Sequence, residues 1–204
     1  MNSPRVYYEG LVAQVSGLLP QGPRLAVIGS TSFWHPQSEA TCIAIGQSLA
    51  RISELIVLTG GVSGVGEAVG RSFFDARSQS PGNRGVFHVL PEGEAVWDYG
   101  ETLFAGLDMG ERREVLGRLA PLYVMVEGGP GTAHEAAVAM SRDATLISVG
   151  KSGGHAAEVY PRVSRPAAVP SQSWLRLGQP DATPQEIADA VHDCVCACLD
   201  LGIR

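Results

Sequence analysis

The chain has 204 residues, of which 45% are hydrophobic and 18% charged, and its formal net charge is −6. A chain of this length and apolar content can bury enough core to fold without disulfides or a structural metal, and its composition is not that of a disordered protein. The 15 basic and 21 acidic residues leave no basic excess for a phosphate backbone, so we expect no nucleic-acid partner. The apolar runs fall far short of the roughly 18 residues of a spanning helix, so we expect a cytoplasmic protein without a membrane partner.

Apolar, β-branched runs alternate along the chain with helical stretches. In chain order the sequence predicts a strand at 25–28, a helix at 38–52, a strand at 55–58, a helix ending near 77, a strand at 86–90, an irregular stretch at 92–108, a helix at 111–119, a strand at 122–126, a helix at 133–140, a strand at 146–149, a short strand at 174–177 and a last helix opened by Thr183 and Pro184.

Strands separated by helices imply crossover connections and a parallel sheet. The strands are continuously apolar, which indicates that helices cover both faces of that sheet. We therefore predict one doubly wound α/β domain spanning residues 1–204. Its core covers about 24–160, and a C-terminal helix at about 184–201 packs back on it.

Glycine is over-represented, with 25 residues in the chain against a typical share of roughly 7%. Four glycine-bearing turns, at 29–32, 59–64, 127–132 and 150–154, follow predicted strands. A single turn of this kind is ordinary punctuation between a strand and a helix. In a parallel sheet, however, all four meet at one edge, where helix N-termini offer free N–H groups, so together they indicate a phosphate cradle.

The common nucleotide fingerprints are absent from these turns. The segment Gly150-Lys151-Ser152 has the end of a P-loop, but Thr145 stands where its first glycine would be. Gly61, Gly64 and Gly66 do not have the spacing of the dinucleotide motif. These departures disfavour kinases, ATPases and dehydrogenases with the standard dinucleotide motif.

Two segments carry more specific chemistry. In 127–135, glycines let the backbone approach an anion, Thr132 can bond a phosphate oxygen, and the Glu135 side chain tilts back toward the turn. The alternative is a capping box formed by Thr132 and Glu135. In 109–113, Arg112 and Arg113 stand near a helix start, where positive charge opposes the macrodipole and suggests a use. The alternative there is a solvated basic turn.

Three neighbouring cysteines, Cys194, Cys196 and Cys198, form the only metal-like pattern. On a helix the first and third share a face and the second lies on another. Structural zinc sites favour wider spacings. We therefore predict reduced cysteines and no metal site.

The order of Met109-Gly110-Glu111-Arg112-Arg113, a helix, an apolar strand and then 128–135 resembles the Lonely Guy (LOG) family of cytokinin-activating phosphoribohydrolases. The turns 59–65 and 28–30 extend the similarity, which covers roughly 25–154. The pattern is shared with the wider SLOG superfamily, which includes molybdenum-cofactor carriers and nucleotide-sensing domains.

The resemblance implies a Rossmann-like fold and hydrolysis of the N-glycosidic bond of a nucleoside 5'-monophosphate. The catalytic residues would be Arg112 and Glu135. The positions that would bind the phosphate or nucleotide are Gly29, Ser30, Thr59, Gly60, Gly61, Ser63, Gly64, Arg113, Gly128, Gly129, Gly131 and Thr132. An AMP-like ligand, a homo-oligomer (dimer or tetramer) and no required metal or redox cofactor follow from the same resemblance. The family's older description as lysine decarboxylases is not supported, because the visible candidate for a Schiff-base lysine is only Lys151 in a glycine loop.

Three positions depart from the LOG pattern. Glu127 replaces a proline and puts a carboxylate beside the predicted cradle, where it either points away, pairing with Arg112 or Arg113, or selects a different ligand. Gly110 replaces a histidine, and His134 replaces an acid. His134 is either an acid/base group or a helix-surface residue. The sequence thus leaves three hypotheses: a phosphoribohydrolase, a non-catalytic nucleotide or molybdenum-cofactor carrier or sensor, and an assembly subunit with a vestigial pocket.

Overall fold

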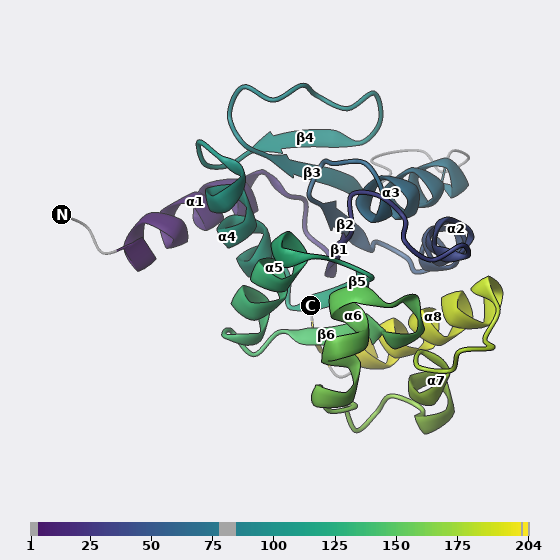
Figure 1. The fold of residues 1–204 in the computed structure, drawn as a ribbon. Coiled ribbons are helices and arrows are strands. Elements are labelled where there is room, and N and C mark those ends of the chain that lie inside the picture. Colours follow the sequence, from purple (N-terminus) through teal and green to yellow (C-terminus); the bar gives the residue numbers. More distant parts are fainter. Residues whose placement is uncertain (1–3, 78–84, 201, 204) are drawn as a thin grey trace.

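The structure, a computed structural model, describes residues 4–77, 85–200 and 202–203. Within these residues, six strands form one parallel sheet in the order β4-β3-β2-β1-β5-β6 (Figure 1). The strands are β1 (Arg24–Gly29), β2 (Ile56–Thr59), β3 (Val86–Leu90), β4 (Glu101–Phe104), β5 (Leu122–Val126) and β6 (Thr145–Val149). The helices are α1 (Pro4–Leu18), α2 (Ser38–Leu49), α3 (Val65–Ala76), α4 (Met109–Leu119), α5 (Pro130–Met140), α6 (Gly154–Val159), α7 (Ser171–Arg176) and α8 (Pro184–Asp200), with 3-10 turns η1 (Gly150–Ser152) and η2 (Tyr160–Arg162).

Two hydrophobic cores lie on opposite faces of the sheet. Alternate residues of each strand point to opposite sides, so Leu25 and Val27 of β1 enter one core and Ala26 and Ile28 the other. Helices α2, α3 and α8 cover the first face, and α1, α4, α5 and α6 cover the second. This arrangement confirms the predicted single α/β domain with a parallel sheet between two helical layers.

Two predicted elements are wrong, and packing explains both. The stretch 92–108, predicted to be irregular, contains β4, an edge strand with the mixed sequence Glu-Thr-Leu-Phe that carries no apolar run. The stretch around 174–177, predicted as a strand, forms the end of α7, where Trp174 is buried, and the residue after it, Leu177, which packs in the core. The last helix is confirmed as α8. Residue 201, where its prediction ended, lies outside the described residues.

The strand register brings the ends of the three central strands together. Val27 of β1 pairs with Thr59 of β2, and Gly29 pairs with Val126 of β5. From β1 the chain builds the sheet in one direction through β2, β3 and β4, and it returns to the other side of β1 as β5. The space between the ends of β1 and β5 is thus the point at which the strand order reverses, where open parallel sheets bind their ligands.

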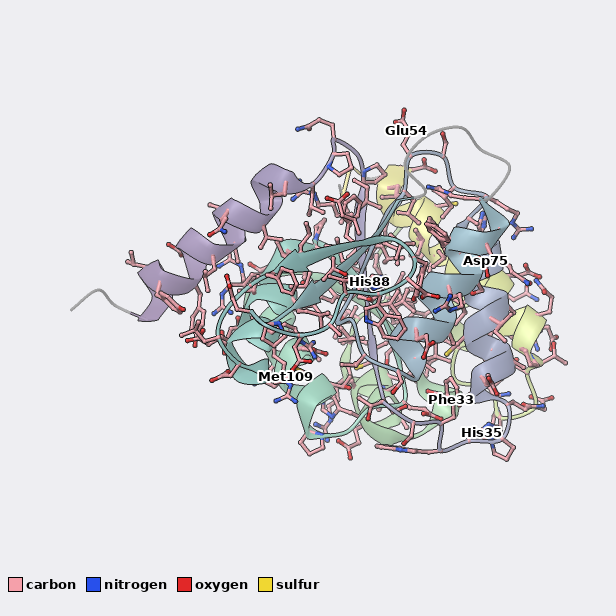
Figure 2. The ribbon with its side chains drawn as sticks, turned by 90° about the horizontal axis from the view of Figure 1, so that it is seen from above. Phe33, His35, Glu54, Asp75, His88 and Met109 are labelled. Carbon is pink, nitrogen blue, oxygen red and sulfur yellow. The ribbon has the colours of Figure 1, made fainter. Side chains whose placement is uncertain are left out.

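Side chains also connect segments that are distant in the sequence. Figure 2 shows His88 of β3 inside the molecule, whereas Glu54 and His35 lie at its periphery. Arg77, just after α3, reaches across to the segment that joins α2 to β2. Its guanidinium donates to the carbonyls of Ala50 (3.2 Å), Leu55 (3.0 Å) and Ile52.

We predict that Arg77→Met lowers the free energy of unfolding by about 2 kcal/mol, because it leaves these carbonyls without their charged donor. Urea denaturation measures the change. Arg51→Met is the control, since the Arg51 side chain is exposed and its pairing with Asp189 spans 3.4 Å at the surface. That change should cost under about 1 kcal/mol. Equal losses in the two variants would contradict the role given to Arg77.

Candidate functional site: a cationic pocket at the end of the central strands

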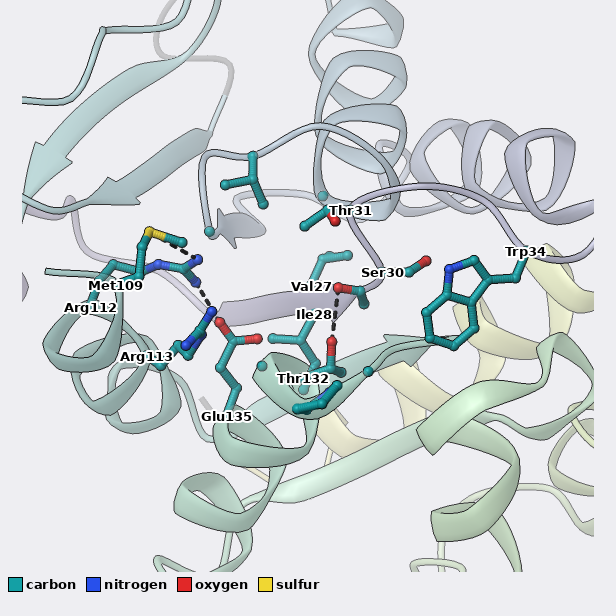
Figure 3. Close-up of a pocket in the computed structure, with 17 residues that line it drawn as sticks. Val27, Ile28, Ser30, Thr31, Trp34, Met109, Arg112, Arg113, Thr132 and Glu135 are labelled. Atoms are coloured by element: carbon teal, nitrogen blue, oxygen red, sulfur yellow. Dashed lines mark hydrogen bonds and ion pairs between the residues drawn. The ribbon is translucent and has the colours of Figure 1, made fainter.

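A cavity of about 270 Å³ opens where the strand order reverses (Figure 3). Its walls come from the turn after β1, the turn after β2, the first turn of α4 and the first two turns of α5. The lining residues are Val27, Ile28, Gly29, Ser30, Thr31, Trp34, Gly60, Val62, Gly66, Met109, Arg112, Arg113, Gly129, Pro130, Gly131, Thr132 and Glu135. The two motifs that carry the LOG resemblance therefore meet in one pocket.

The centre of the pocket is an ion pair between Arg112 of α4 and Glu135 of α5. Nη1 of Arg112 donates to Oε1 of Glu135, and the two residues are only 3% and 5% exposed. Gly60 makes room for this pair, since a Cβ there would lie 2.5 Å from Nη1 of Arg112. Asp108 sets the start of α4 by accepting the N–H groups of Gly110 (2.8 Å) and Glu111 (2.9 Å).

Burial shapes the charges of this pair. It lowers the pKa of Arg112, and the negative charge of Glu135 offsets part of that change. Burial also raises the pKa of Glu135, and the positive charges of Arg112 and Arg113 offset only part of the rise. Nε of Arg112 is buried without a hydrogen-bond partner in the described part of the chain. The pair is therefore costly to bury and has one unsatisfied donor.

Arg113 is the uncompensated charge of the pocket. Its guanidinium packs over the start of α5, where a Cβ at Gly131 would lie 3.1 Å from Nε of Arg113. Among the described residues it has no hydrogen-bond or ion-pair partner. Because Arg112 and Glu135 cancel, the cavity keeps about one net positive charge although the whole chain is acidic.

The start of α5 adds backbone donors beside Arg113. The helix begins at Pro130, with Gly129 as its N-cap, and the first intrahelical bond runs from Ala133 N to Gly129 O (2.9 Å). The N–H groups of Gly131 and Thr132 precede that bond. The predicted start at 133, and with it the capping box of Thr132 and Glu135, is wrong. Instead the Thr132 hydroxyl donates to Gly29 O (2.9 Å) and joins the turns after β1 and β5.

The structure brings only part of the predicted site to the cavity. Of the predicted positions, Gly29, Ser30, Gly60, Arg112, Arg113, Gly129, Gly131, Thr132 and Glu135 line it, and Thr59, Gly61, Ser63, Gly64, Glu127, Gly128 and His134 do not. Gly64 and Gly128 have positive φ angles (86° and 104°) and lie against neighbouring backbone and against Thr132. Ser63 is exposed and donates to Thr31 O (3.2 Å). These residues therefore shape the glycine turns without lining the cavity.

The Thr59 hydroxyl forms hydrogen bonds within a buried network and does not line the cavity. Nε2 of His88 lies 3.0 Å from Tyr99 O, which can only accept, so we assign the proton to Nε2. Nδ1 then accepts from the Thr59 hydroxyl (2.7 Å), and that oxygen accepts from Gly61 N (3.2 Å). Burial lowers the pKa of His88 to about 4 and keeps it neutral near pH 7. The network fixes the glycine turn that faces Arg112.

Glu127 points away from the cavity and is fully buried. Its carboxylate accepts the Ser30 hydroxyl and the N–H groups of Trp34 (3.0 Å) and His35 (2.9 Å). It pairs with neither Arg112 nor Arg113 in the described structure. Burial alone would raise its pKa, but the hydrogen bonds from Ser30 and from the two backbone N–H groups outweigh this and hold the pKa below its ordinary value. Its φ of 55° is left-handed, a strained state for this residue type.

His134 lies on the outer side of α5, with Nε2 at 2.6 Å from Oε1 of Glu114. Glu114 also binds Arg118, one turn further along α4. The three side chains form a surface network between the two helices, which agrees with the helix-surface alternative for His134.

Several lining residues were not among the predicted site residues. Trp34, Thr31 and Val62 reach the cavity from loops, and Met109 lies beside Arg112, with its sulfur 3.9 Å from Nη2. Met109 belongs to the arginine motif, and Thr31 and Val62 belong to the glycine turns 29–32 and 59–64, so of these four only Trp34 had no signal in the sequence. In the described ranges no three His, Cys, Asp or Glu side chains come together as a possible metal site. No described helix is long and apolar enough to cross a membrane.

The sheet order and this pocket define a Rossmann-like α/β protein with a cavity lined by two arginines at the point of strand reversal. The profile of the SLOG cluster4 family matches residues 23–172. The chain therefore belongs to the SLOG cluster4 family. The narrower resemblance to LOG hydrolases stays a prediction.

Solved structures agree with this fold. The protein TM1055, a structural genomics target, is 24% identical, with a TM-score of 0.60 over 83% of this chain and 98% of its own. The molybdenum cofactor binding protein of Rippkaea orientalis is 17% identical, with a TM-score of 0.58 over 86% and 98%. The molybdenum cofactor carrier protein of Chlamydomonas reinhardtii is 24% identical, with a TM-score of 0.50 over 62% and 75%. Comparison with the curated proteins gives no match.

We predict that Glu127→Gln lowers the free energy of unfolding by about 1–3 kcal/mol, because the amide turns one acceptor into a donor that faces other donors. The carboxylate has a depressed pKa in the folded state, so its contribution is present above the unfolded pKa and is lost as pH falls through the folded value. Denaturation curves at pH 7 and below pH 4.5 should therefore differ less for the variant than for the wild type.

The matched control is Glu39→Gln, the same chemical change at an exposed position on α2. It should leave the stability at pH 7 within about 0.5 kcal/mol. A Glu127→Gln variant as stable as this control would contradict the buried role of Glu127.

Proposed function

We propose that the pocket binds a nucleoside 5'-monophosphate and hydrolyses its N-glycosidic bond to the free base and ribose 5-phosphate. The observation that carries this proposal is the buried pair of Arg112 and Glu135 beside the uncompensated Arg113. It offers an anion site and a desolvated carboxylate within one cavity of about 270 Å³.

The phosphate would bind Arg113 and the N–H groups of Gly131 and Thr132. An arginine fork matches phosphate oxygens, and the start of a helix adds donors and partial positive charge. Glycine at 131 leaves the guanidinium of Arg113 room to lie beside these N–H groups, since a Cβ there would lie 3.1 Å from its Nε. Glu127 does not oppose this, because its carboxylate is turned to Ser30 and the backbone of Trp34 and His35.

Glu135 would act on the sugar. Oε1 is held by Arg112, whereas Oε2 accepts no hydrogen bond from the described residues. As the glycosidic bond breaks, the base leaves with the electron pair and takes up a proton, and water adds its hydroxyl to the anomeric carbon. The positive charge that develops on the sugar is stabilised by a carboxylate in a site of low dielectric. Arg112 orients that carboxylate through the bond from Nη1 to Oε1. The proposed reaction needs no metal or redox cofactor.

A second candidate is a carrier or sensor that binds such a ligand without cleaving it. The ion pair favours it, because Arg112 already neutralises the charge that hydrolysis would use. Two solved proteins with this fold are described as binding or carrying molybdenum cofactor. The same cationic pocket would hold a phosphorylated ligand in either case, so turnover separates the two candidates.

We predict that Glu135→Gln lowers kcat/KM by about 10²–10³-fold, because the amide cannot stabilise developing positive charge. The measurement is chromatography of free base released from AMP, GMP, CMP and UMP. His134→Gln is the control on the same helix but outside the pocket, and it should keep activity within about twofold of wild type. If the wild-type protein leaves all four monophosphates intact, the hydrolase proposal is wrong.

The pH profile gives an independent prediction. Burial raises the pKa of Glu135, and the reaction needs the ionised carboxylate, so kcat/KM should fall as pH drops through a value above the ordinary 4.5. The profile of His134→Gln should keep this acidic limb, shifted if anything to higher pH, because His134 lowers the pKa of Glu135 electrostatically. An acidic limb at or below pH 4.5, or one that disappears in His134→Gln, would contradict the assignment to Glu135.

A further inference from the structure

Trp34 is a large aromatic side chain that the proposed reaction does not use. It is 55% exposed and lines the same cavity as Arg112 and Glu135. Figure 3 shows its indole at the opposite end of the pocket from the two arginines, with Glu135, Ser30 and Thr132 between them. What sets Trp34 apart from the other exposed apolar side chains is that it lines this cavity with a large flat ring that is free to contact a ligand.

Two glycines form a seat for the indole. A Cβ at Gly129 would lie 3.6 Å from Cη2 of Trp34, and one at Gly154 would lie 2.7 Å from Cζ3. Gly154 also has a φ of 56°, which a larger residue would adopt only with strain. The ring thus rests on backbone from the turn after β5 and from the first residue of α6, and the side chain also faces the pocket and solvent.

A buried carboxylate fixes the backbone that carries the ring. Oε1 of Glu127 accepts the N–H of Trp34 at 3.0 Å and that of His35 at 2.9 Å, while Oε2 accepts the Ser30 hydroxyl. Glu127 is itself held by its N–H, which donates to Ser152 Oγ at 2.7 Å. Glu127 is therefore a positioning residue for Trp34, and the loop is fixed at both its backbone and its ring.

We propose that Trp34 stacks on the planar heterocyclic ring of the ligand and determines its specificity for ring-bearing phosphates. This inference rests on the proposed function and deepens it. A phosphate on Arg113 and a sugar over Glu135 leave the ring directed to the far end, where Trp34 lies. A rigid indole loses little conformational freedom on stacking, and stacking accepts any flat base, so the site should select for ring area more than for base identity.

The test is calorimetric titration of wild type, Trp34→Ala and Trp34→Phe with two probes. Formycin 5'-monophosphate carries a purine-like ring joined by a carbon–carbon bond that glycosidic hydrolysis cannot break. Ribose 5-phosphate carries the phosphate and sugar without a ring. The control is Leu175→Ala, because Leu175 is also a large, exposed apolar side chain but lies on α7, outside the cavity.

For the ring-bearing probe, Trp34→Ala should weaken binding on the order of 5- to 150-fold. Trp34→Phe should stay within about fivefold of wild type, since the smaller ring still stacks. Ribose 5-phosphate should bind all variants within about twofold, and Leu175→Ala should match wild type for both probes.

Equal weakening for both probes would overturn the proposal, because Trp34 would then only shape the pocket. Unchanged binding of the ring-bearing probe to Trp34→Ala would overturn it too, as would a wild-type protein that binds this probe no better than ribose 5-phosphate. Hydrolysis is judged apart, on AMP with the wild type. If AMP stays intact while the ring-bearing probe still depends on Trp34, the hydrolase proposal fails and the stacking proposal stands.

Discussion

The burial of Arg112 and Glu135 against each other is the constraint on which the pocket depends. Two charges removed from water are tolerated only when they meet with good geometry, so α4 and α5 must pack closely and in register. Gly117 makes that approach possible, since a Cβ there would lie 2.7 Å from the Val138 side chain and 3.0 Å from Glu135 O. Gly60 leaves space for the guanidinium on the other side. The glycines and the ion pair are therefore parts of one arrangement.

This arrangement gives a different explanation for the high glycine content of the chain. The sequence suggests a phosphate cradle at every turn, but most of these glycines contact the protein itself. Gly64 lies against the backbone of Ser30 and Thr31, Gly128 against Thr132, and Gly61 against Leu90. Gly131 likewise leaves room for a protein side chain, since a Cβ there would lie 3.1 Å from Nε of Arg113. The turns are tight so that the ends of three strands and two helices can meet around a small cavity.

The sequence predicts what depends on local pattern and misses what depends on distant contacts. Buried strands such as Leu122–Val126 are readable because both faces are covered and every residue is apolar. The edge strand β4 is not, because one side of it is unpaired and its residues are mixed. Arg112 and Glu135 each belong to a motif that can be recognised in the sequence, and the fold brings the two motifs together. Trp34 has no such signal, since its seat is made by glycines 95 or more positions away that only the fold brings under it.

Glu127 shows how a carboxylate can lie next to a cationic pocket without lining it. As a free neighbour it would repel a phosphate, at about 4 kcal/mol for 4 Å and a surface-like dielectric. Here its oxygens accept from Ser30 and from the backbone of Trp34 and His35, so its charge is spread over these donors and the carboxylate does not line the cavity. Its left-handed backbone is the strain that this orientation requires. A proline at this position could make none of these bonds, and the loop that carries the indole would lose its anchor. The departure from the LOG pattern thus goes with the loop that holds the Trp34 indole opposite the arginines of the pocket.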